Sequence, residues 1–304
     1  MKIKYQDEKG NFHEGKLLDS KNEFKIIDCE LCGFAHAIPI PSEDFLNQYY
    51  SEKYVGKRPE YFSRIIEDLD WWNILYDEKY DLLEKNLKTN KRKILDVGSG
   101  AGYFLKKGVE RGWDTLGVEP SKQSSKHAEE LGLKIVNESL NKGNYKNLGT
   151  FSAIHMHEVL EHIPDPVEFI GMLKKMLDKN GLLMIVCPND YNPLQLSYAK
   201  SDNHWWVAPP EHLNYFNVKS ITKLLEKLDF SVLDLTTTFP LELFLIMGDN
   251  YIGNSVLGRK IHTKRKNFDK LLFENNEILR REFYKQLAKI GIGREFIVVA
   301  KKNK

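Results

Sequence analysis

Two glutamates and a histidine stand close together in the segment His157-Glu158-Val159-Leu160-Glu161-His162. On a helix, Glu158, Glu161 and His162 would occupy positions i, i+3 and i+4, so their side chains could meet on one turn. Two carboxylates and an imidazole can ligate a divalent cation such as Mg²⁺, which lowers the pKa of a bound hydroxyl. The alternative is a polar turn between a strand and a helix that holds no metal.

A second cluster of chemically capable residues runs from His204 to Phe216 and contains HWW and PPEHLNYF. His212 could act as a general base, or as a fourth ligand of a metal bound by the first group. The aromatic residues Trp205, Trp206, Tyr215 and Phe216 could stack on a sugar ring or fill a core. We therefore take His212, His162 and Glu158 as the candidate catalytic residues, and Glu158, Glu161, His162 and His212 as the candidate metal ligands.

A glycine-rich turn follows the apolar run Ile94–Val97, in the order Gly98-Ser99-Gly100-Ala101-Gly102. Glycines between a strand and a helix let a ligand approach the bare backbone and the N–H groups at the helix start. The spacing G-x-G-x-G differs from the G-x-G-x-x-G expected around a dinucleotide pyrophosphate. It suits an adenosyl ligand that carries no phosphate.

The next candidate strand, Thr115 to Glu119, ends in an acid followed by Pro120. An acid at this place can accept hydrogen bonds from both hydroxyls of a ribose. Together with the glycine turn, Glu119 predicts an adenosyl-ligand site. An NAD-dependent oxidoreductase and a protein that binds the ligand without catalysis remain the alternatives.

Residues 94–187 resemble the core of the class I S-adenosylmethionine-dependent methyltransferases, through the motifs ILDVGSGAGYF, GVEPS and AIHMHEVLEHIPDP. The resemblance implies that Asp96 and the glycine turn line the methionine end of S-adenosylmethionine. It places Glu119 at the ribose and Glu138 or Ser139 near the adenine. The candidate cofactor-binding residues are Asp96, Gly98, Ser99, Gly100, Gly102, Tyr103, Glu119, Pro120, Glu138, Ser139 and His157.

The arrangement E-x-x-E-H resembles that of ubiquinone-pathway O-methyltransferases and small-RNA 2′-O-methyltransferases, which use it to bind metal. The second cluster and the segment Val218 to Leu228 resemble a methyltransferase subgroup common in bacterial surface-polysaccharide and secondary-metabolite pathways. This likeness implies O-methylation of a sugar, a glycan precursor or a similar small molecule. Methyl transfer would be in-line, with help from a base or a metal.

Cys29 and Cys32 form a single Cys-x-x-Cys pair, whereas a zinc ribbon requires two. Related methyltransferases often begin with a complete set of two pairs, and Cys29 to Phe34 matches the second of these. His13 and His36 could replace the missing cysteines. We expect instead a degenerate zinc-ribbon-like turn that has lost its metal, with zinc at Cys29 and Cys32 not favoured.

Short apolar runs alternate with helical segments from Lys93 onward, which predicts a mostly parallel sheet with helices on both faces. The fold class is therefore α/β and Rossmann-like, with seven strands. The resemblance makes the last strand, Phe296 to Ala300, antiparallel. We expect three regions: a small β-rich appendage at 1–41, helices at 42–90 and a methyltransferase domain at 91–304. A helical insertion at about 240–291 is expected to form part of a lid.

The helices at 42–90 are expected to begin at Ser42. Within them, the spacing of Tyr61, Ile65, Leu69 and Trp72 predicts one buried helical face.

The composition of the chain indicates its expected cellular compartment and the classes of partner it can bind. The chain has 304 residues and a net charge of +2, which gives no general attraction to nucleic acid. The N-terminus lacks the apolar core of a signal peptide, and no apolar stretch is long enough to span a membrane. Three cysteines are too few for a secreted disulfide framework. We expect a cytoplasmic enzyme with a small-molecule or glycan-type acceptor, and the sequence does not indicate its oligomeric state.

Overall fold

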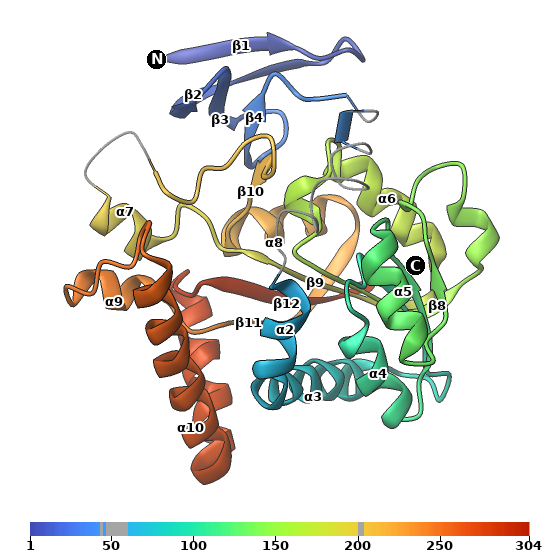
Figure 1. Ribbon diagram of the computed structural model, residues 1–304. Helices are drawn as coiled ribbons and strands as arrows, with labels where there is room; N and C mark the ends of the chain where they lie inside the picture. The colour runs from blue at the N-terminus through green and yellow to red at the C-terminus, as the bar shows by residue number, and fades with distance from the viewer. Residues whose placement is uncertain (43–44, 47–59, 200–203, 304) are drawn as a thin grey trace.

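The computed structural model describes residues 1–42, 45–46, 60–199 and 204–303. It contains a seven-stranded sheet and a smaller five-stranded sheet, which lies at the top of Figure 1. The helix start expected at Ser42 to Asp44 lies largely outside the described residues. No helix among the described residues combines the length and the apolar character needed to cross a bilayer.

The large sheet has the order β11-β12-β9-β8-β5-β6-β7. Its strands pair in parallel from β9 to β7, whereas β12 is antiparallel to both β9 and β11. This confirms the predicted Rossmann-like sheet and its antiparallel last strand. The strands are β5 (Lys93–Val97), β6 (Asp114–Val118), β7 (Ile135–Val136), β8 (Phe151–His157), β9 (Leu177–Pro188), β11 (Phe230–Thr237) and β12 (Glu295–Lys302).

Helices cover both faces of this sheet. Successive strand residues point to opposite sides, so apolar side chains on both faces have to be covered. On one face, Leu95 and Ile185 pack with side chains of α6 (Pro166–Met176) and α8 (Val218–Lys227). On the other, Ile94 and Met184 pack with Tyr80 and Phe104. These two aromatics belong to α3 (Leu69–Asn86) and α4 (Tyr103–Glu110). A further helix beside the sheet, α5 (Lys122–Glu130), packs next to β7.

The predicted N-terminal helices are present, but their buried face differs from the prediction. The helix breaks at Asp68 between α2 (Tyr61–Glu67) and α3, so Tyr61, Ile65, Leu69 and Trp72 do not form one stripe. The inner face of α3 consists of Trp71, Leu75, Lys79, Tyr80 and Leu83. Because the helix breaks, the residues of α3 do not continue the face of α2, and Trp71 instead of Trp72 is buried in the core.

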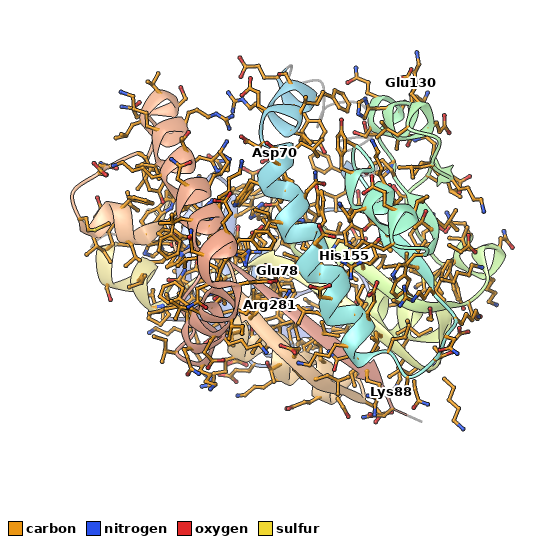
Figure 2. All side chains as sticks on the ribbon, turned by 90° about the horizontal axis from the view of Figure 1, so that it is seen from below. Asp70, Glu78, Lys88, Glu130, His155 and Arg281 are labelled. Atoms are coloured by element: carbon orange, nitrogen blue, oxygen red, sulfur yellow. The ribbon has the colours of Figure 1, made fainter. Side chains whose placement is uncertain are left out.

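The helical segment between β11 and β12 lies at the β11 end of the sheet (Figure 1). Its short helix α9 (Glu242–Ile246) packs on α7 (Pro193–Tyr198), and its long helix α10 (Ser255–Lys289) packs on α3 and β11. Seen from below in Figure 2, α10 and α3 run side by side, with Arg281 and Glu78 on their facing sides. A role of this segment as a lid remains a prediction.

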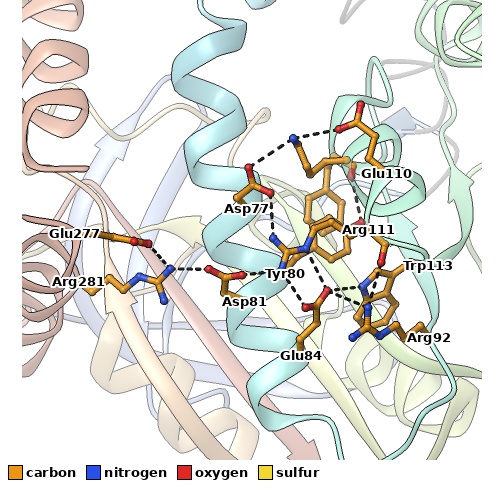
Figure 3. Close-up of polar contacts among 12 residues, drawn as sticks. Asp77, Tyr80, Asp81, Glu84, Arg92, Glu110, Arg111, Trp113, Glu277 and Arg281 are labelled. Atoms are coloured by element: carbon orange, nitrogen blue, oxygen red, sulfur yellow. Dashed lines mark hydrogen bonds and ion pairs between the residues drawn. The ribbon is translucent and has the colours of Figure 1, made fainter. Parts of the chain in front are cut away.

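Ion pairs join α3 to its two neighbours. Arg111, just after α4, donates to Asp81 over 2.6 Å and to Glu84 over 2.9 Å, and Arg281 of α10 donates to the other oxygen of Asp81 over 2.6 Å (Figure 3). Deeper in the same interface, the fully buried Arg280 donates to both carboxylate oxygens of Glu78. The interface therefore contains one buried arginine and one half-exposed arginine side by side.

The neighbouring pair Arg280 and Arg281 allows a matched stability test. We expect Arg280→Ala to lower the free energy of unfolding by about 3–5 kcal/mol, because it leaves Glu78 and Asp269 without their buried cation. Arg281→Ala removes half-exposed ion pairs with Asp81 and Glu277 and should cost about 0–1 kcal/mol. Urea denaturation of both variants measures the difference. Equal losses would show that the buried Arg280 contributes no more to the packing of α10 on α3 than the half-exposed Arg281.

The small sheet has the order β1-β2-β3-β4-β10. Four of its strands are the predicted appendage: β1 (Lys2–Gln6), β2 (Phe12–Lys21), β3 (Phe24–Cys29) and β4 (Ala35–Ile38). The fifth, β10 (Asn214–Tyr215), comes from the methyltransferase part of the chain, where Asn214 pairs with His36. The appendage is thus joined by backbone pairing to the segment that carries His212.

Candidate active site

The glycine turn lies where β5 ends, and its three glycines all have left-handed backbone. Gly98, Gly100 and Gly102 have φ of 69°, 52° and 84°. A Cβ at Gly98 would lie 2.5 Å from Val159 Cγ2, and one at Gly100 would lie 2.9 Å from the Tyr61 hydroxyl. The turn is pulled towards β6 because Gly98 N donates to Val118 O over 2.8 Å. Only glycine fits these dihedrals and contacts without strain.

Gly102 and Gly112 form a natural control pair for the crowding at this turn. Both have positive φ, but a Cβ at Gly102 would lie 2.6 Å from Leu133 Cδ1, whereas one at Gly112 meets nothing within 4 Å. We expect Gly112→Ala to cost about 1–2 kcal/mol from its backbone alone. Gly102→Ala should cost about 1–3 kcal/mol more, from overpacking. Chemical denaturation measures the free energy of unfolding of both variants. Equal losses of this free energy would show that the neighbours of Gly102 move aside and that the new Cβ is not crowded.

Glu119 follows β6 directly and reaches back to the glycine turn. Its Oε2 accepts a hydrogen bond from Gly100 N over 2.9 Å, and its Oε1 accepts one from Ser121 N over 2.8 Å. Burial raises the pKa of Glu119, and these two backbone donors oppose that rise. The carboxylate is held rigidly beside the turn, with lone pairs left for a ribose diol.

Asp96 is buried at the end of β5, on the face covered by α3 and α4. Its Oδ1 lies 2.7 Å from His155 Nδ1 on the neighbouring strand β8. Burial raises the pKa of Asp96 well above its ordinary value and lowers that of His155 well below. Both effects favour an uncharged pair. Asp96 is therefore tied to His155, a partner that the motif alone did not indicate.

The remaining cofactor candidates surround the same edge. Tyr103 begins α4, and its hydroxyl lies 3.2 Å from His127 Nε2. Glu138 follows β7, where its Oε2 accepts from Asn144 Nδ2 over 2.9 Å. The Ser139 carbonyl accepts from two asparagine side chains, and Pro120 lies between Glu119 and Ser121. Strand order β8-β5-β6-β7 thus brings the candidates of four segments to one sheet edge.

These residues fit an adenosyl ligand on two structural observations. The turn offers a cradle that a side chain at Gly100 would fill, since its Cβ would meet Tyr61. Beside it, the buried Ser99 Oγ has no hydrogen-bond partner among the described residues. An unsatisfied buried hydroxyl next to a bare backbone is expected where a polar ligand binds.

Beyond β8, three of the predicted metal ligands meet. One donor atom from each of Glu161, His162 and His212 lies within 4.8 Å of the others. His162 Nε2 is 3.7 Å from Glu161 Oε1, and the two imidazole rings are 5.1 Å apart. His162 Nδ1 donates to the Glu211 carbonyl over 2.5 Å, which leaves Nε2 facing Glu161 as an acceptor.

Backbone and side-chain bonds hold the two segments of this cluster together. Leu213 N donates to Glu161 O over 2.8 Å, and Asn214 Nδ2 donates to Ile163 O over 2.7 Å. Burial raises the pKa of Glu161 well above its ordinary value, and the charge of Glu158 adds to the rise. A cation placed between Glu161 and the histidines would reverse this shift, because opposite charge favours the carboxylate.

Glu158 does not join the other three, which corrects the expectation of one shared helical turn. The segment forms a single 3₁₀ turn at Leu160–His162, and Glu158 precedes it with a left-handed φ of 53°. This backbone turns Glu158 outward, where it groups with His157 and Glu295. The i, i+3, i+4 argument failed because the residues are not on an α-helix.

His157, one of the cofactor candidates, belongs to a partly buried polar network whose other members, Lys79 and Glu295, were not identified from the sequence. Its Nδ1 accepts from Lys79 Nζ over 3.2 Å, and its Nε2 donates to Glu295 Oε1 over 3.0 Å. Burial lowers the pKa of Lys79 to about 8. A lysine in register with Trp71, Leu75 and Leu83 on the inner face of α3 was the signal available in the sequence.

The aromatic residues of the second cluster mostly form core. Trp206, Tyr215 and Phe216 are buried, and Trp206 and Tyr215 pack with Val207 and Ala37. Trp205 is partly exposed and contacts Tyr198. Trp206, Tyr215 and Phe216 therefore fill a core. Of these four aromatic residues, only Trp205 remains available for stacking on an acceptor.

Comparison with known proteins places this geometry in a family. The family model that describes a methyltransferase domain matches residues 71–235, which are more than half of the chain. A ubiquinone biosynthesis O-methyltransferase of Pelagibacter ubique is 26% identical over 218 residues, which cover 59% of this chain and 89% of that protein. Its counterpart in Actinobacillus pleuropneumoniae is 32% identical over 153 residues, covering 43% of this chain and 65% of that protein.

Solved structures show the same fold at low sequence identity. The plantazolicin methyltransferase BpumL, in complex with a desmethylPZN analog and SAH, has a TM-score of 0.53 and 15% identity over 86% of this chain and 94% of that chain. The plantazolicin methyltransferase BamL has a TM-score of 0.53 and 16% identity over 85% of this chain and 94% of its own. Together with the glycine turn, Glu119 and the sheet order, the family match excludes the alternative of an NAD-dependent oxidoreductase. The chain belongs to the methyltransferase-domain family and is an S-adenosylmethionine-dependent methyltransferase.

Proposed function

We propose that this enzyme methylates a hydroxyl oxygen of a small molecule, at a site formed by Glu161, His162 and His212. The observation that carries the proposal is the convergence of these three donors beyond the end of β8. A hydroxyl is a weak nucleophile until it loses its proton, and an imidazole such as that of His162 or His212 is suited to remove it. The O-methyltransferase names of the relatives support the same reaction.

In the proposed reaction, a lone pair of the acceptor oxygen attacks the methyl carbon of S-adenosylmethionine in line with the sulfonium bond. The new O–C bond forms as the C–S bond breaks, and S-adenosylhomocysteine leaves with the electron pair. The acceptor proton passes to His212 or His162. The glycine turn and Glu119 hold the cofactor, so positioning supplies much of the rate.

A divalent cation fits the same three donors. Bound there, it would lower the pKa of the acceptor hydroxyl. Two imidazoles and one carboxylate resemble the ligand sets of transition metals such as Mn²⁺ or Fe²⁺ more than the all-oxygen sets that Mg²⁺ prefers. With Glu158 turned away, the Mg²⁺ expected from the motif is therefore less well matched than a nitrogen-binding metal.

The acceptor class proposed from the sequence is a sugar, a glycan precursor or a similar small molecule. Trp205 supports it as the partly exposed aromatic of the second cluster. The relatives' name in ubiquinone biosynthesis favours a second class, a hydroxylated precursor of that pathway. We also keep the cytoplasm as the proposed location.

An acceptor screen tests the reaction. Purified enzyme, S-adenosylmethionine labelled in its methyl group, and panels of sugar nucleotides and hydroxylated quinone precursors would be incubated with and without a chelator. We expect label in an O-methyl group of a member of one panel, assigned by mass spectrometry. Transfer only to nitrogen or carbon would overturn the proposal. Loss of transfer with the chelator, restored by Mn²⁺ but not Mg²⁺, would identify the metal-assisted form.

A further inference from the structure

Four potential metal ligands converge inside the small N-terminal sheet, far from the glycine turn in sequence. One donor atom each from His13, Cys29, Cys32 and His36 lies within 4.8 Å of the others. His13 comes from β2, Cys29 ends β3, Cys32 follows in the next turn and His36 lies in β4. Strand pairing assembles them, because β3 is the central partner of both β2 and β4.

The distances match the edges of a zinc tetrahedron. His13 Nδ1 lies 3.6 Å from Cys29 Sγ and 3.5 Å from Cys32 Sγ, and it lies 3.2 Å from His36 Nε2. Bond lengths of about 2.3 Å for Zn–S and about 2.05 Å for Zn–N give edges of about 3.6 Å between sulfur and nitrogen and about 3.3 Å between two nitrogens. The three edges that meet at His13 Nδ1 therefore already have the lengths of a zinc site, and the other three are no longer than 4.8 Å.

The outer nitrogens of both histidines have acceptor partners that fix the tautomers. His13 Nε2 lies 3.2 Å from Asp7 Oδ2, and His36 Nδ1 lies 3.0 Å from the Ala37 carbonyl. Each outer nitrogen must therefore carry the proton. A carboxylate and a backbone carbonyl are also the usual outer partners of histidines that bind metal.

This assignment leaves two nitrogen lone pairs facing each other inside the cluster. Neutral His13 and neutral His36 cannot hydrogen-bond across their 3.2 Å gap, because both inner nitrogens are acceptors. His13, Cys29 and His36 are buried, so water does not separate them. A cation between the lone pairs and the thiolates removes this conflict. Two thiolates and two neutral imidazoles also bring the charge of Zn²⁺ to zero, as a buried site requires.

We propose that this sheet binds one structural zinc ion through His13, Cys29, Cys32 and His36. This proposal departs from the expectation of a turn that had lost its metal. Four protein ligands leave no open position, which is typical of a structural and not a catalytic zinc site. The site lies next to the active-site segment, since His36 pairs with Asn214, two residues beyond His212. Zinc would hold the sheet edge to which that segment is bonded.

Metal analysis of the full chain tests this proposal independently of methyl transfer. We expect about one zinc per chain after exhaustive dialysis, and loss of most of it in Cys29→Ser and His36→Ala. His212→Ala is the matched control, because it removes a histidine from the metal-capable group of Glu161, His162 and His212 and should keep the zinc. Exchange for Co²⁺ should give the visible and thiolate charge-transfer bands of a tetrahedral site.

A conservative variant covers the case in which the ligand-removal variants fail to fold. His36→Cys supplies a thiolate in place of the imidazole and should keep about one zinc per chain. Wild-type protein from zinc-supplemented growth that carries no zinc would overturn the proposal. So would zinc that is kept in a folded Cys29→Ser variant and lost in His212→Ala, which would assign it to the active site.

Discussion

Replacing Glu119 by alanine is expected to weaken binding of S-adenosylhomocysteine about 100-fold, while the protein stays folded. The variant removes the acceptor of both ribose hydroxyls in the proposed complex. It also leaves Gly100 N and Ser121 N without the carboxylate that now accepts from them. Hydrogen bonds to a charged group contribute about 1.5–3 kcal/mol each, so the loss of two predicts at least about 3 kcal/mol, which is a weakening of about 100-fold or more.

Isothermal titration calorimetry measures this change directly. Glu129→Ala is the control, because Glu129 lies on the same segment after β6 but is exposed on α5. Its affinity for S-adenosylhomocysteine should equal that of the wild type. An unchanged dissociation constant in Glu119→Ala would remove Glu119 from the ribose site and direct attention to Glu138. A loss in both variants would indicate damage to α5 and not a lost contact.

The Rossmann-like sheet was predictable because its central strands, such as β5 and β9, contain short apolar runs that end at a turn. Ile94 to Val97 stops in glycines and Thr115 to Val118 stops at Glu119, so the ends of β5 and β6 could be located without coordinates. Parallel neighbours bring such ends to one edge. The meeting of the candidate cofactor residues at one edge was therefore predictable, and their binding of the cofactor stays a prediction.

The partners of those residues were not predictable, since they come from remote segments. His155 and Lys79 contact Asp96 and His157 through packing of β8 and α3, and no local pattern specifies those contacts. Glu158 shows a different limit. Its spacing from Glu161 indicated a shared helical turn. Glu158 itself has left-handed backbone between the strand and the 3₁₀ turn, and this directs its side chain away from Glu161.

The small sheet shows how pairing completes a pattern that looks broken in sequence. Cys29 and Cys32 lack a second pair of cysteines, and His13 is distant from both along the chain. Register supplies what spacing could not: Gly15 pairs with Cys29, and His36 pairs with Ile27, so both histidines approach the cysteine turn. The two-residue strand β10, which attaches this sheet to the active-site segment, is too short to give any sequence signal.

Replacing His212 by alanine is expected to lower kcat for methyl transfer about 10²–10⁴-fold, with cofactor binding unchanged. His212 adjoins Glu161 and His162, whereas the glycine turn and Glu119 lie at the ends of β5 and β6. The loss should therefore fall on kcat, and the dissociation constant for S-adenosylhomocysteine should equal that of the wild type. Stopped-time assays with the acceptor found by the screen, combined with calorimetry, separate the two.

The role of His212 follows from how the residual activity responds to pH and to metal. If His212 is the base, the residual rate should rise with pH as hydroxide replaces it, and a chelator should have no effect on the wild type. If His212 binds a cation, the wild type should lose activity with a chelator and the variant should require a much higher Mn²⁺ concentration. Full activity in His212→Ala would remove His212 from the chemistry and leave His162 as the proton acceptor to be tested by the corresponding alanine variant.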